Sequence, residues 1–209
     1  MERFGRSRSS VHRIINQQRA RELFGRRIEY IQSREFTEPD AMETILAIPL
    51  EHLAPRPDRD NVLLSRQQET DLFRRYNYLK FLAADQRQQI QRGRPRSGRL
   101  DRIEHWLGQA ETVKQIIIEA NMPLVISIAG KHLTAGVQMS ELVSEGSIAL
   151  MAAVEKFDYT RGYRFSTYAS WAIVKDFARM IPAESKRLDR ADGTDFANLS
   201  ANVRLGQLP

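Results

Sequence analysis

The chain has 209 residues, 42% hydrophobic and 28% charged, which is enough to bury one sizeable core. It contains no cysteine, which excludes disulfides and thiolate chemistry and suits a reducing cytoplasm. No apolar run of membrane-spanning length and no signal-peptide core stand out, so we expect a cytoplasmic protein that does not bind a membrane.

The net charge of +6 is concentrated at the N-terminus, where residues 1–34 hold nine arginines and three glutamates. One amphipathic helix is expected there from Ser10 to about Arg27, and four prolines divide residues 35–61 into linker and turns. Such an arm either contacts phosphates or stays disordered, and the pattern does not distinguish the two. Residues 1–61 are therefore predicted to be a basic, partly disordered arm and linker.

Residues 62–182 are predicted to form one helical domain. Ser65 and Gln68 fit a capping box that opens a helix through about Ala84. The inward side of that helix is expected to be Leu72, Tyr76, Leu79 and Ala83, and its outward side Arg74, Arg75 and Lys80. Residues 86–102, with six arginines against one aspartate, indicate a basic loop that is either solvated or bound to phosphate.

Two more helices precede the aromatic part of the chain. A long helical pattern covers residues 103–133, with Pro123 expected to break or bend it and Asn121 available to cap a new start. The next helix is expected to begin at Ser140, with Gly146 allowing a neighbour to approach closely. The predicted fold class is all-α, a compact helical bundle followed by a polar tail at 183–209.

A last helix, capped at Ser166 and ended by Pro182, carries two stripes at helical spacing. The apolar stripe consists of Ala169, Ala172, Ile173, Phe177 and Met180. The second stripe consists of Tyr168, Trp171, Lys175 and Arg179. Rings beside cations suit a single-stranded nucleic acid, because rings stack on bases and cations hold phosphates. Aromatic residues at the edge of a core are the alternative interpretation.

The turn before this helix strengthens the nucleic-acid interpretation. Four rings alternate there with three cations, and Gly162 permits a tight bend. The residues are Lys156, Phe157, Tyr159, Arg161, Tyr163, Arg164 and Phe165. So many rings outside a helical period are hard to explain as core alone, although a core position competes for Tyr163 and especially for Phe165.

Catalytic chemistry finds little support. Glu141 and Glu145 are spaced i, i+4, but no His or Asp lies near them in sequence, and the four histidines show no ligand spacing. A carboxylate-based nuclease is the one enzyme hypothesis that remains, and it is a weak one. We predict no enzyme, no catalytic residue, no metal and no cofactor.

Residues 140–173, SELVSEGSIALMAAVEKFDYTRGYRFSTYASWAI, closely resemble region 2 of bacterial RNA polymerase sigma factors of the housekeeping type. The resemblance extends back through NMPLVISIAGKH and, more weakly, to LLSRQQETDLFRRYNYLK, which is similar to region 1.2 of that family. It covers roughly residues 62–180. It implies the helical bundle of sigma region 2 and a factor that binds core RNA polymerase and recognises and melts the promoter −10 element.

The resemblance also implies two sets of site residues. The helix that docks on the clamp helices of the polymerase β′ subunit would present Glu141, Leu142, Ser144, Glu145, Ser147 and Met151. The unpaired non-template strand would meet Lys156, Phe157, Asp158, Arg161, Tyr163, Arg164, Thr167, Tyr168, Trp171, Lys175 and Arg179. Within that set, Phe157, Asp158, Arg161, Thr167 and Tyr168 would form the pocket of a flipped adenine.

The sequence departs from the family in three places. The usual Trp-Trp pair is Trp171-Ala172, the Gln and Thr that read the first −10 base pair are Lys175 and Ala178, and two core-facing polar residues are Ser144 and Ser147. The lysine cannot repeat an amide contact to adenine, so we expect altered or relaxed preference at the duplex position.

Only 28 residues follow Ile181, too few for sigma regions 3 and 4. We therefore expect either a truncated product or a minimal factor without −35 recognition. Two further alternatives are a decoy that occupies the polymerase clamp without starting transcription and a stand-alone single-strand binder.

Overall fold

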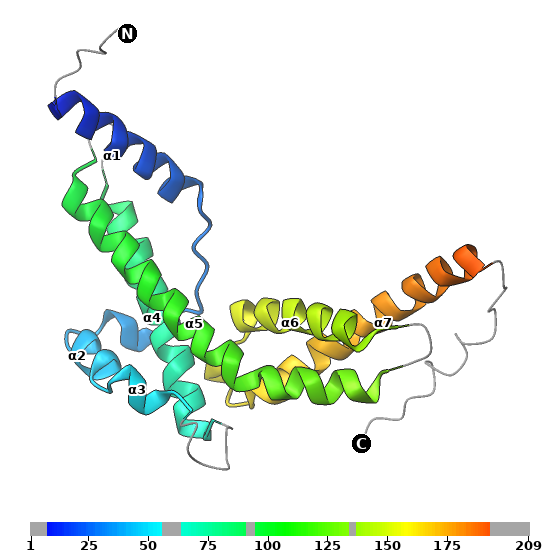
Figure 1. Cartoon of the computed structure of the whole chain (residues 1–209). Helices are drawn as coiled ribbons and strands as arrows, with labels where there is room; N and C mark the ends of the chain where they lie inside the picture. Colours follow the sequence, from blue (N-terminus) through cyan, green and yellow to red (C-terminus); the bar gives the residue numbers. More distant parts are fainter. Residues whose placement is uncertain (1–7, 56–63, 91–94, 134–136, 193–209) are drawn as a thin grey trace, which may run out of the picture. The chain divides into compact units, whose positions relative to one another are not determined.

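The computed structural model describes residues 8–55, 64–90, 95–133 and 137–192, with side chains up to residue 181. These ranges form seven α-helices, two 3-10 helices and no strand (Figure 1), so the all-α class is confirmed. The chain divides into two compact units, the first with the described residues up to 116 and the second with those from 117 onward. This boundary differs from the single helical domain expected for residues 62–182.

The first unit contains most of the helices. Its elements are α1 (Arg8–Gly25), η1 (Arg34–Thr37), α2 (Ala41–Leu46), α3 (Leu50–Leu53), α4 (Arg66–Gln88) and α5 (Ser97–Lys131) as far as residue 116. The expected capping box is confirmed at the start of α4: the Ser65 hydroxyl accepts from the Gln68 amide, and the Gln68 side chain accepts from the Ser65 amide. The expected stripe of α4 is also buried.

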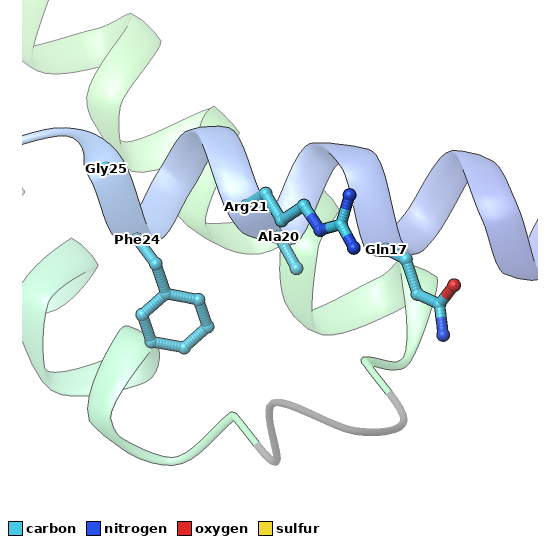
Figure 2. Close-up of a pocket in the computed structure, with 5 residues that line it drawn as sticks. All are labelled: Gln17, Ala20, Arg21, Phe24 and Gly25. Carbon is cyan, nitrogen blue, oxygen red and sulfur yellow. The ribbon is translucent and has the colours of Figure 1, made fainter.

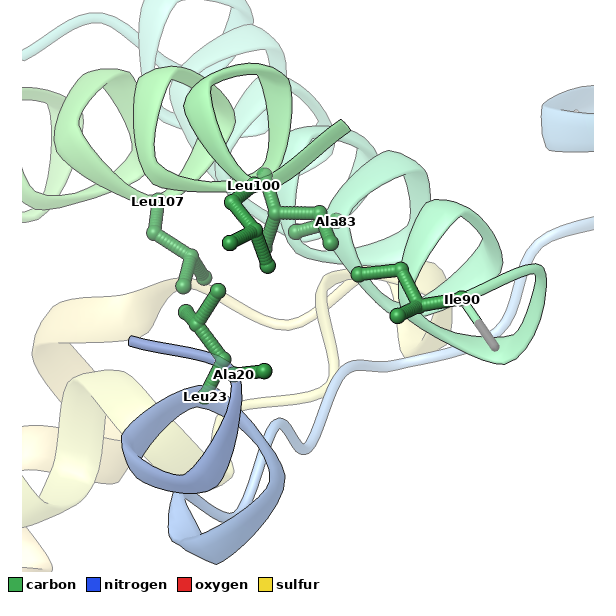
Figure 3. Packing of buried hydrophobic residues seen from close by; sticks show 7 residues of the cluster. Ala20, Leu23, Ala83, Ile90, Leu100 and Leu107 are labelled. Atoms are coloured by element: carbon green, nitrogen blue, oxygen red, sulfur yellow. The ribbon is translucent and has the colours of Figure 1, made fainter. Parts of the chain in front are cut away.

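Three helices share a hydrophobic cluster in this unit (Figure 3). It contains Ala20, Leu23, Ala83, Ile90, Leu100, Ile103 and Leu107. The expectation of a basic loop over 86–102 is therefore wrong at both ends, since α4 continues to Gln88 and α5 begins at Ser97. Leu100 and Ile103 are spaced to face the core together, and their burial outweighs the Arg-rich composition of the segment.

The helix expected from Ser10 to about Arg27 is confirmed as α1, but residues 34–53 differ from the expected linker. They form η1, α2 and α3, and Phe36, Ala41 and Ile45 make a second buried cluster with Tyr78 of α4. Residues 1–7 and 56–63 lie outside the described ranges. On α1, Leu23 is buried, whereas Val11, Ile14 and Ile15 are exposed. A shallow pocket along α1 is lined by Gln17, Ala20, Arg21, Phe24 and Gly25 (Figure 2).

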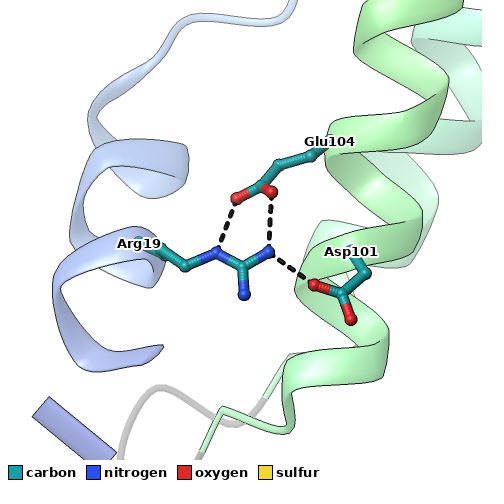
Figure 4. A network of polar contacts seen from close by, with 3 residues as sticks. All are labelled: Arg19, Asp101 and Glu104. Carbon is teal, nitrogen blue, oxygen red and sulfur yellow. Dashed lines mark hydrogen bonds and ion pairs between the residues drawn. The ribbon is translucent and has the colours of Figure 1, made fainter. Parts of the chain in front are cut away.

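A polar clamp ties α1 to α5 within the first unit (Figure 4). Arg19 donates from Nε to Glu104 at 2.9 Å and from one terminal nitrogen to both Glu104 and Asp101 at 2.6 Å. Hydrogen bonds from the guanidinium to Glu104 and Asp101 raise the pKa of Arg19 above its usual range. The bidentate geometry fixes α1 in register against α5.

The outward side expected for α4 is only partly right. Lys80 is buried at 7% exposure, where its ammonium lies 4.6 Å from the Tyr76 ring centroid. Arg74 and Arg75 are half-buried, and Arg75 donates to the Ile48 carbonyl at 2.7 Å. Burial lowers the pKa of Arg75. The segment with α2 and α3, which was expected to be a linker, contacts α4, and its Ile48 carbonyl lies against Arg75.

The second unit contains α5 from residue 117, α6 (Met139–Lys156), η2 (Tyr159–Arg161) and α7 (Phe165–Asp192). Pro123 was expected to break or bend this helix, and it does not break it, since α5 runs through the proline to Lys131. Asn121 does not cap a new helix but is buried, and its amide donates to the Ile117 carbonyl at 2.8 Å. Val125 and Ile128 follow the proline on the buried face, and their packing outweighs the loss of one backbone hydrogen bond.

The ends of α6 and α7 differ slightly from expectation. Gln138, not Ser140, caps α6, in a reciprocal box with Glu141. α7 begins at Phe165, so Ser166 lies inside the helix, and α7 continues past Pro182 to Asp192. The structure thus extends helix into the expected polar tail, and residues 193–209 lie outside the described ranges.

Close helix packing at Gly146 is confirmed. α6 and α7 lie side by side (Figure 1). A Cβ added at Gly146 would lie 2.7 Å from Val125 Cγ1 and 3.2 Å from Phe177 Cζ. Both neighbours are fully buried, so neither can move aside cheaply.

One helix in the described part of the chain, α5, is long and apolar enough to cross a membrane by length and composition. The expectation that no such stretch exists was therefore too strong. The observation is weak evidence for a membrane, because 44% of the stretch is buried inside the protein and core helices pass the same test.

Arg19→Ala combined with Glu104→Ala tests the clamp. The two carboxylates are partly exposed, so a double-mutant cycle in urea unfolding should give a coupling of about 0.5–1 kcal/mol that falls with added salt. Arg13→Ala, an exposed arginine on the same helix, is the control and should change stability little. A coupling near zero at low salt would contradict the clamp.

Gly146→Ala should destabilise the second unit by about 1–3 kcal/mol, because the new methyl group overpacks Val125 and Phe177. Thermal unfolding followed by circular dichroism measures it. Gly130→Ala is the matched control: nothing lies within 4 Å of its added Cβ, so helix propensity should leave stability equal or higher. Equal melting temperatures for the two variants would refute the close contact.

Candidate nucleic-acid interface

The amphipathic character of α7 sets the site. Ala169, Ile173 and Phe177 are completely buried, as the apolar stripe predicted, and Ala172 and Met180 are half-buried. These residues repeat at intervals of four, so one side of the helix is committed to the core of the second unit. The opposite side must face outward, and it is the side that carries the second predicted stripe.

Rings and cations lie on that outward side. Trp171 is 59% exposed, and the Lys175 ammonium lies 4.8 Å from the centroid of its ring. Lys175 and Arg179 are both exposed, and Arg179 pairs with Asp176 one turn back. An exposed indole beside lysine offers a stacking surface next to positive charge.

A polar network holds the turn between α6 and α7. Asp158 Oδ1 accepts from the Thr160 amide at 3.1 Å and the Thr160 hydroxyl at 2.6 Å, and Oδ2 accepts from Arg161 Nε at 2.9 Å. Burial acts to raise the pKa of Asp158, but these hydrogen bonds outweigh it and hold the pKa below its usual value. The carboxylate is therefore ionised at neutral pH.

Gly162 ends η2 in the left-handed region at φ 75°, which confirms its expected role in the bend. Phe157 and Phe165 anchor the turn from below, with ring centroids 5.2 Å apart in an edge-on arrangement. Phe157 was expected to contact DNA, but it is only 4% exposed and belongs to the core. Phe165, for which a core position was the alternative, is also buried. Tyr168 is half-buried with its ring 5.7 Å from Phe157, whereas Tyr163 is 73% exposed.

The predicted DNA-binding set thus divides by exposure. The exposed members are Lys156, Arg161, Tyr163, Arg164, Thr167, Trp171, Lys175 and Arg179. Asp158 and Tyr168 are half-buried, and Phe157 is buried. The outer face of α7 and the turn before it therefore bring most of the set to one accessible stretch of the second unit. Sequence reasoning missed Thr160 as a member of the turn network, although an Asp-x-Thr spacing is the signal for such a turn.

The predicted polymerase-binding helix, α6, needs one correction. Leu142 is completely buried, because it repeats with Gly146, Ala149 and Ala153 on the side that faces the core. Ser144 and Met151 are exposed, and Glu141, Glu145 and Ser147 are half-buried. Ile148 was not predicted, yet it is 57% exposed and lies four residues after Ser144 and three before Met151. The apolar centre of this outer face is therefore Ile148 with Met151.

Within the ranges that the structure describes, no group of three or more His, Cys, Asp or Glu residues could hold a metal ion. Glu141 has a structural partner instead, since its carboxylate accepts from the backbone amide of Gln138 at 3.1 Å. What the site offers is a binding surface: exposed rings, cations, and one ionised carboxylate engaged in its own turn.

Comparison with known families finds a match over the second unit. Residues 117–187 match the family model of Sigma-70 region 2. The matched segment includes the whole of α6, η2 and the described face of α7. It begins at Ile117, which is also the first α5 residue that belongs to the second unit. It covers less than half of the 209 residues. This part of the chain is therefore similar to region 2 of sigma-70 factors, and the match supports a sigma-factor-like role in promoter recognition together with RNA polymerase.

Proposed function

We propose that this protein is a sigma factor that binds core RNA polymerase and recognises and melts the promoter −10 element to start transcription in the cytoplasm. The observation that carries the proposal is the outward placement of Trp171, Lys175 and Tyr163 in the unit that matches Sigma-70 region 2. Had these side chains been buried in the core, they could not have contacted a separated strand.

Stacking on the exposed rings can offset part of the free energy that strand opening costs. Each opened base step loses stacking and pairing, and a base stacked on an aromatic side chain recovers about 1–3 kcal/mol. Trp171 and Tyr163 present ring surface for such stacking, and half-buried Tyr168 offers an edge beside them. A few rings can therefore offset a few opened steps, mainly on the non-template strand.

The cations hold the strand in register. Lys156, Arg164 and Lys175 are exposed along the turn and the outer face of α7. They would contact phosphates, which fixes position without reading sequence. Lys175 and Ala178 stand where the family carries a base-reading Gln and Thr, so we propose relaxed preference at the first, still paired −10 position.

The polymerase contact is proposed for the outer face of α6. Ile148 and Met151 form its apolar centre, with Ser144, Ser147, Glu141 and Glu145 around them. An apolar centre with a polar rim is the arrangement of a transient protein interface. The clamp helices of the β′ subunit are the proposed partner. Run-off transcription with core polymerase on a promoter that has a −10 element but no −35 element tests the whole proposal, since a clamp-binding decoy would give no transcript.

Trp171→Ala should weaken binding to a single-stranded −10 oligonucleotide by about 5–150-fold, since one stacked base is worth about 1–3 kcal/mol. Fluorescence anisotropy measures the affinity. Because Trp171 is exposed, the fold should be unchanged, and pull-down of core polymerase should equal that of the wild type. Loss of both activities together would place Trp171 in the fold and not in the strand contact.

Ile148→Asp and Met151→Asp should give the reverse pattern. A charge at the apolar centre of the interface should reduce core polymerase binding by about tenfold or more, while oligonucleotide binding is retained. Pull-down with purified core enzyme measures this. Ser127→Asp, at an exposed position on α5 of the same unit, controls for added negative charge. Undiminished pull-down of both variants would refute the docking face.

A further inference from the structure

The ionised carboxylate of Asp158 is the unusual member of the proposed site. It stands among exposed cations on a surface meant for a polyanion, where a negative charge by itself repels phosphate. Its immediate surroundings show why it is there. Each of its oxygens accepts hydrogen bonds from within the same turn, two on Oδ1 from Thr160 and one on Oδ2 from Arg161.

The contact to Arg161 is specific in its geometry. Asp158 Oδ2 accepts a hydrogen bond from Nε–H of the guanidinium at 2.9 Å, and this contact does not involve the terminal amino groups. The Arg161 side chain is 72% exposed, and it is the Nε atom that pairs with Asp158. A guanidinium held at Nε keeps the four N–H donors of its terminal nitrogens, and two of these, one on each nitrogen, form the outward fork that matches two oxygens of a phosphate.

The rest of the turn keeps this arrangement in place. Asp158 caps η2 through the Thr160 amide, and Gly162 closes the turn in the left-handed region. Phe157, directly before Asp158, is buried against Phe165. The carboxylate is thus attached to the core on one side and holds the arginine on the other, so the arginine loses little freedom on binding.

We propose that Asp158 is a positioning residue: it holds Arg161 by Nε so that the outer edge of the guanidinium clamps one phosphate of the single DNA strand, and it does not touch the strand itself. This inference rests on the proposed function and changes the role assigned from sequence, in which Asp158 and Arg161 both contact the flipped base. Three of the roughly four acceptor positions of the Asp158 carboxylate are used inside the turn, which leaves it little capacity for a contact with a base.

The sign of one substitution separates the two roles. Asp158→Asn removes a negative charge from a surface that binds a polyanion, so simple electrostatics makes binding tighter. The positioning role makes it weaker, because the amide holds the guanidinium less firmly. We expect Asp158→Asn to weaken binding about tenfold, in line with a hydrogen bond to a charged group.

The experiment measures binding of the full chain to a fluorescent single-stranded −10 oligonucleotide over a range of salt. The variants are Asp158→Asn, Arg161→Ala and the double variant. Loss of one phosphate contact should lower the slope of log affinity against log salt by about 0.7 in each. The double variant should bind no more weakly than Arg161→Ala alone, since Asp158 acts only through the arginine.

Thr160→Val is the matched control for the turn itself. It removes the hydroxyl bond to Oδ1 and leaves the Arg161 contact on Oδ2, so its salt slope should equal that of the wild type. A slope lowered as much as in Asp158→Asn would mean that the carboxylate only stabilises the turn. Unchanged or tighter binding by Asp158→Asn, or losses that multiply in the double variant, would also overturn the proposal.

If Asp158→Asn does not fold by circular dichroism, Arg161→Lys replaces it. Lysine keeps the charge but lacks both Nε and the fork, so the same loss of affinity and slope is expected, and wild-type behaviour would overturn the clamp. Wild-type protein that does not bind the oligonucleotide would overturn the proposed function, and this inference with it. Binding by the wild type with the wrong variant pattern overturns this inference alone.

Discussion

The burial of one side of α7 is the constraint on which the site depends. Ile173 and Phe177 are fully enclosed in the second unit, and Gly146 lets α6 approach closely enough to enclose them. With the helix fixed about its axis in this way, Trp171 and Lys175 have only the solvent side available. The chemistry of the outer face is therefore a consequence of packing on the inner one.

The same core supports the turn that precedes α7. Phe157 and Phe165 meet edge-on beneath it, so the polar network of Asp158, Thr160 and Arg161 rests on buried rings. Aromatic residues in this stretch thus do two kinds of work. Those at 157 and 165 are structural, and those at 163 and 171 are available to a ligand. Composition alone could not separate the two groups, because all four are aromatic residues within fifteen positions of each other.

Much of the fold could be predicted from periodicity and capping. The start of α4, the buried stripe of α7 and the bend at Gly162 follow from local patterns and are confirmed. Predictions failed where distant contacts decide. Pro123 stays inside a helix because its flanking residues are packed, and Arg75, expected to face outward, is half-buried where it donates to the Ile48 carbonyl. Leu142 was assigned to the wrong side of its helix. The family likeness identified α6 as the docking helix, but only the contact at Gly146 fixes which side of it faces outward.

The lysine over the indole of Trp171 has a consequence for how a strand could be admitted. In the free protein an internal ammonium already occupies one face of the ring, 4.8 Å from its centre. A base that stacks on the same face must first displace the Lys175 ammonium, which then becomes available to a neighbouring phosphate. Arrival of the base and capture of the backbone would in that case be one exchange, and until then Lys175 shields one face of the Trp171 ring.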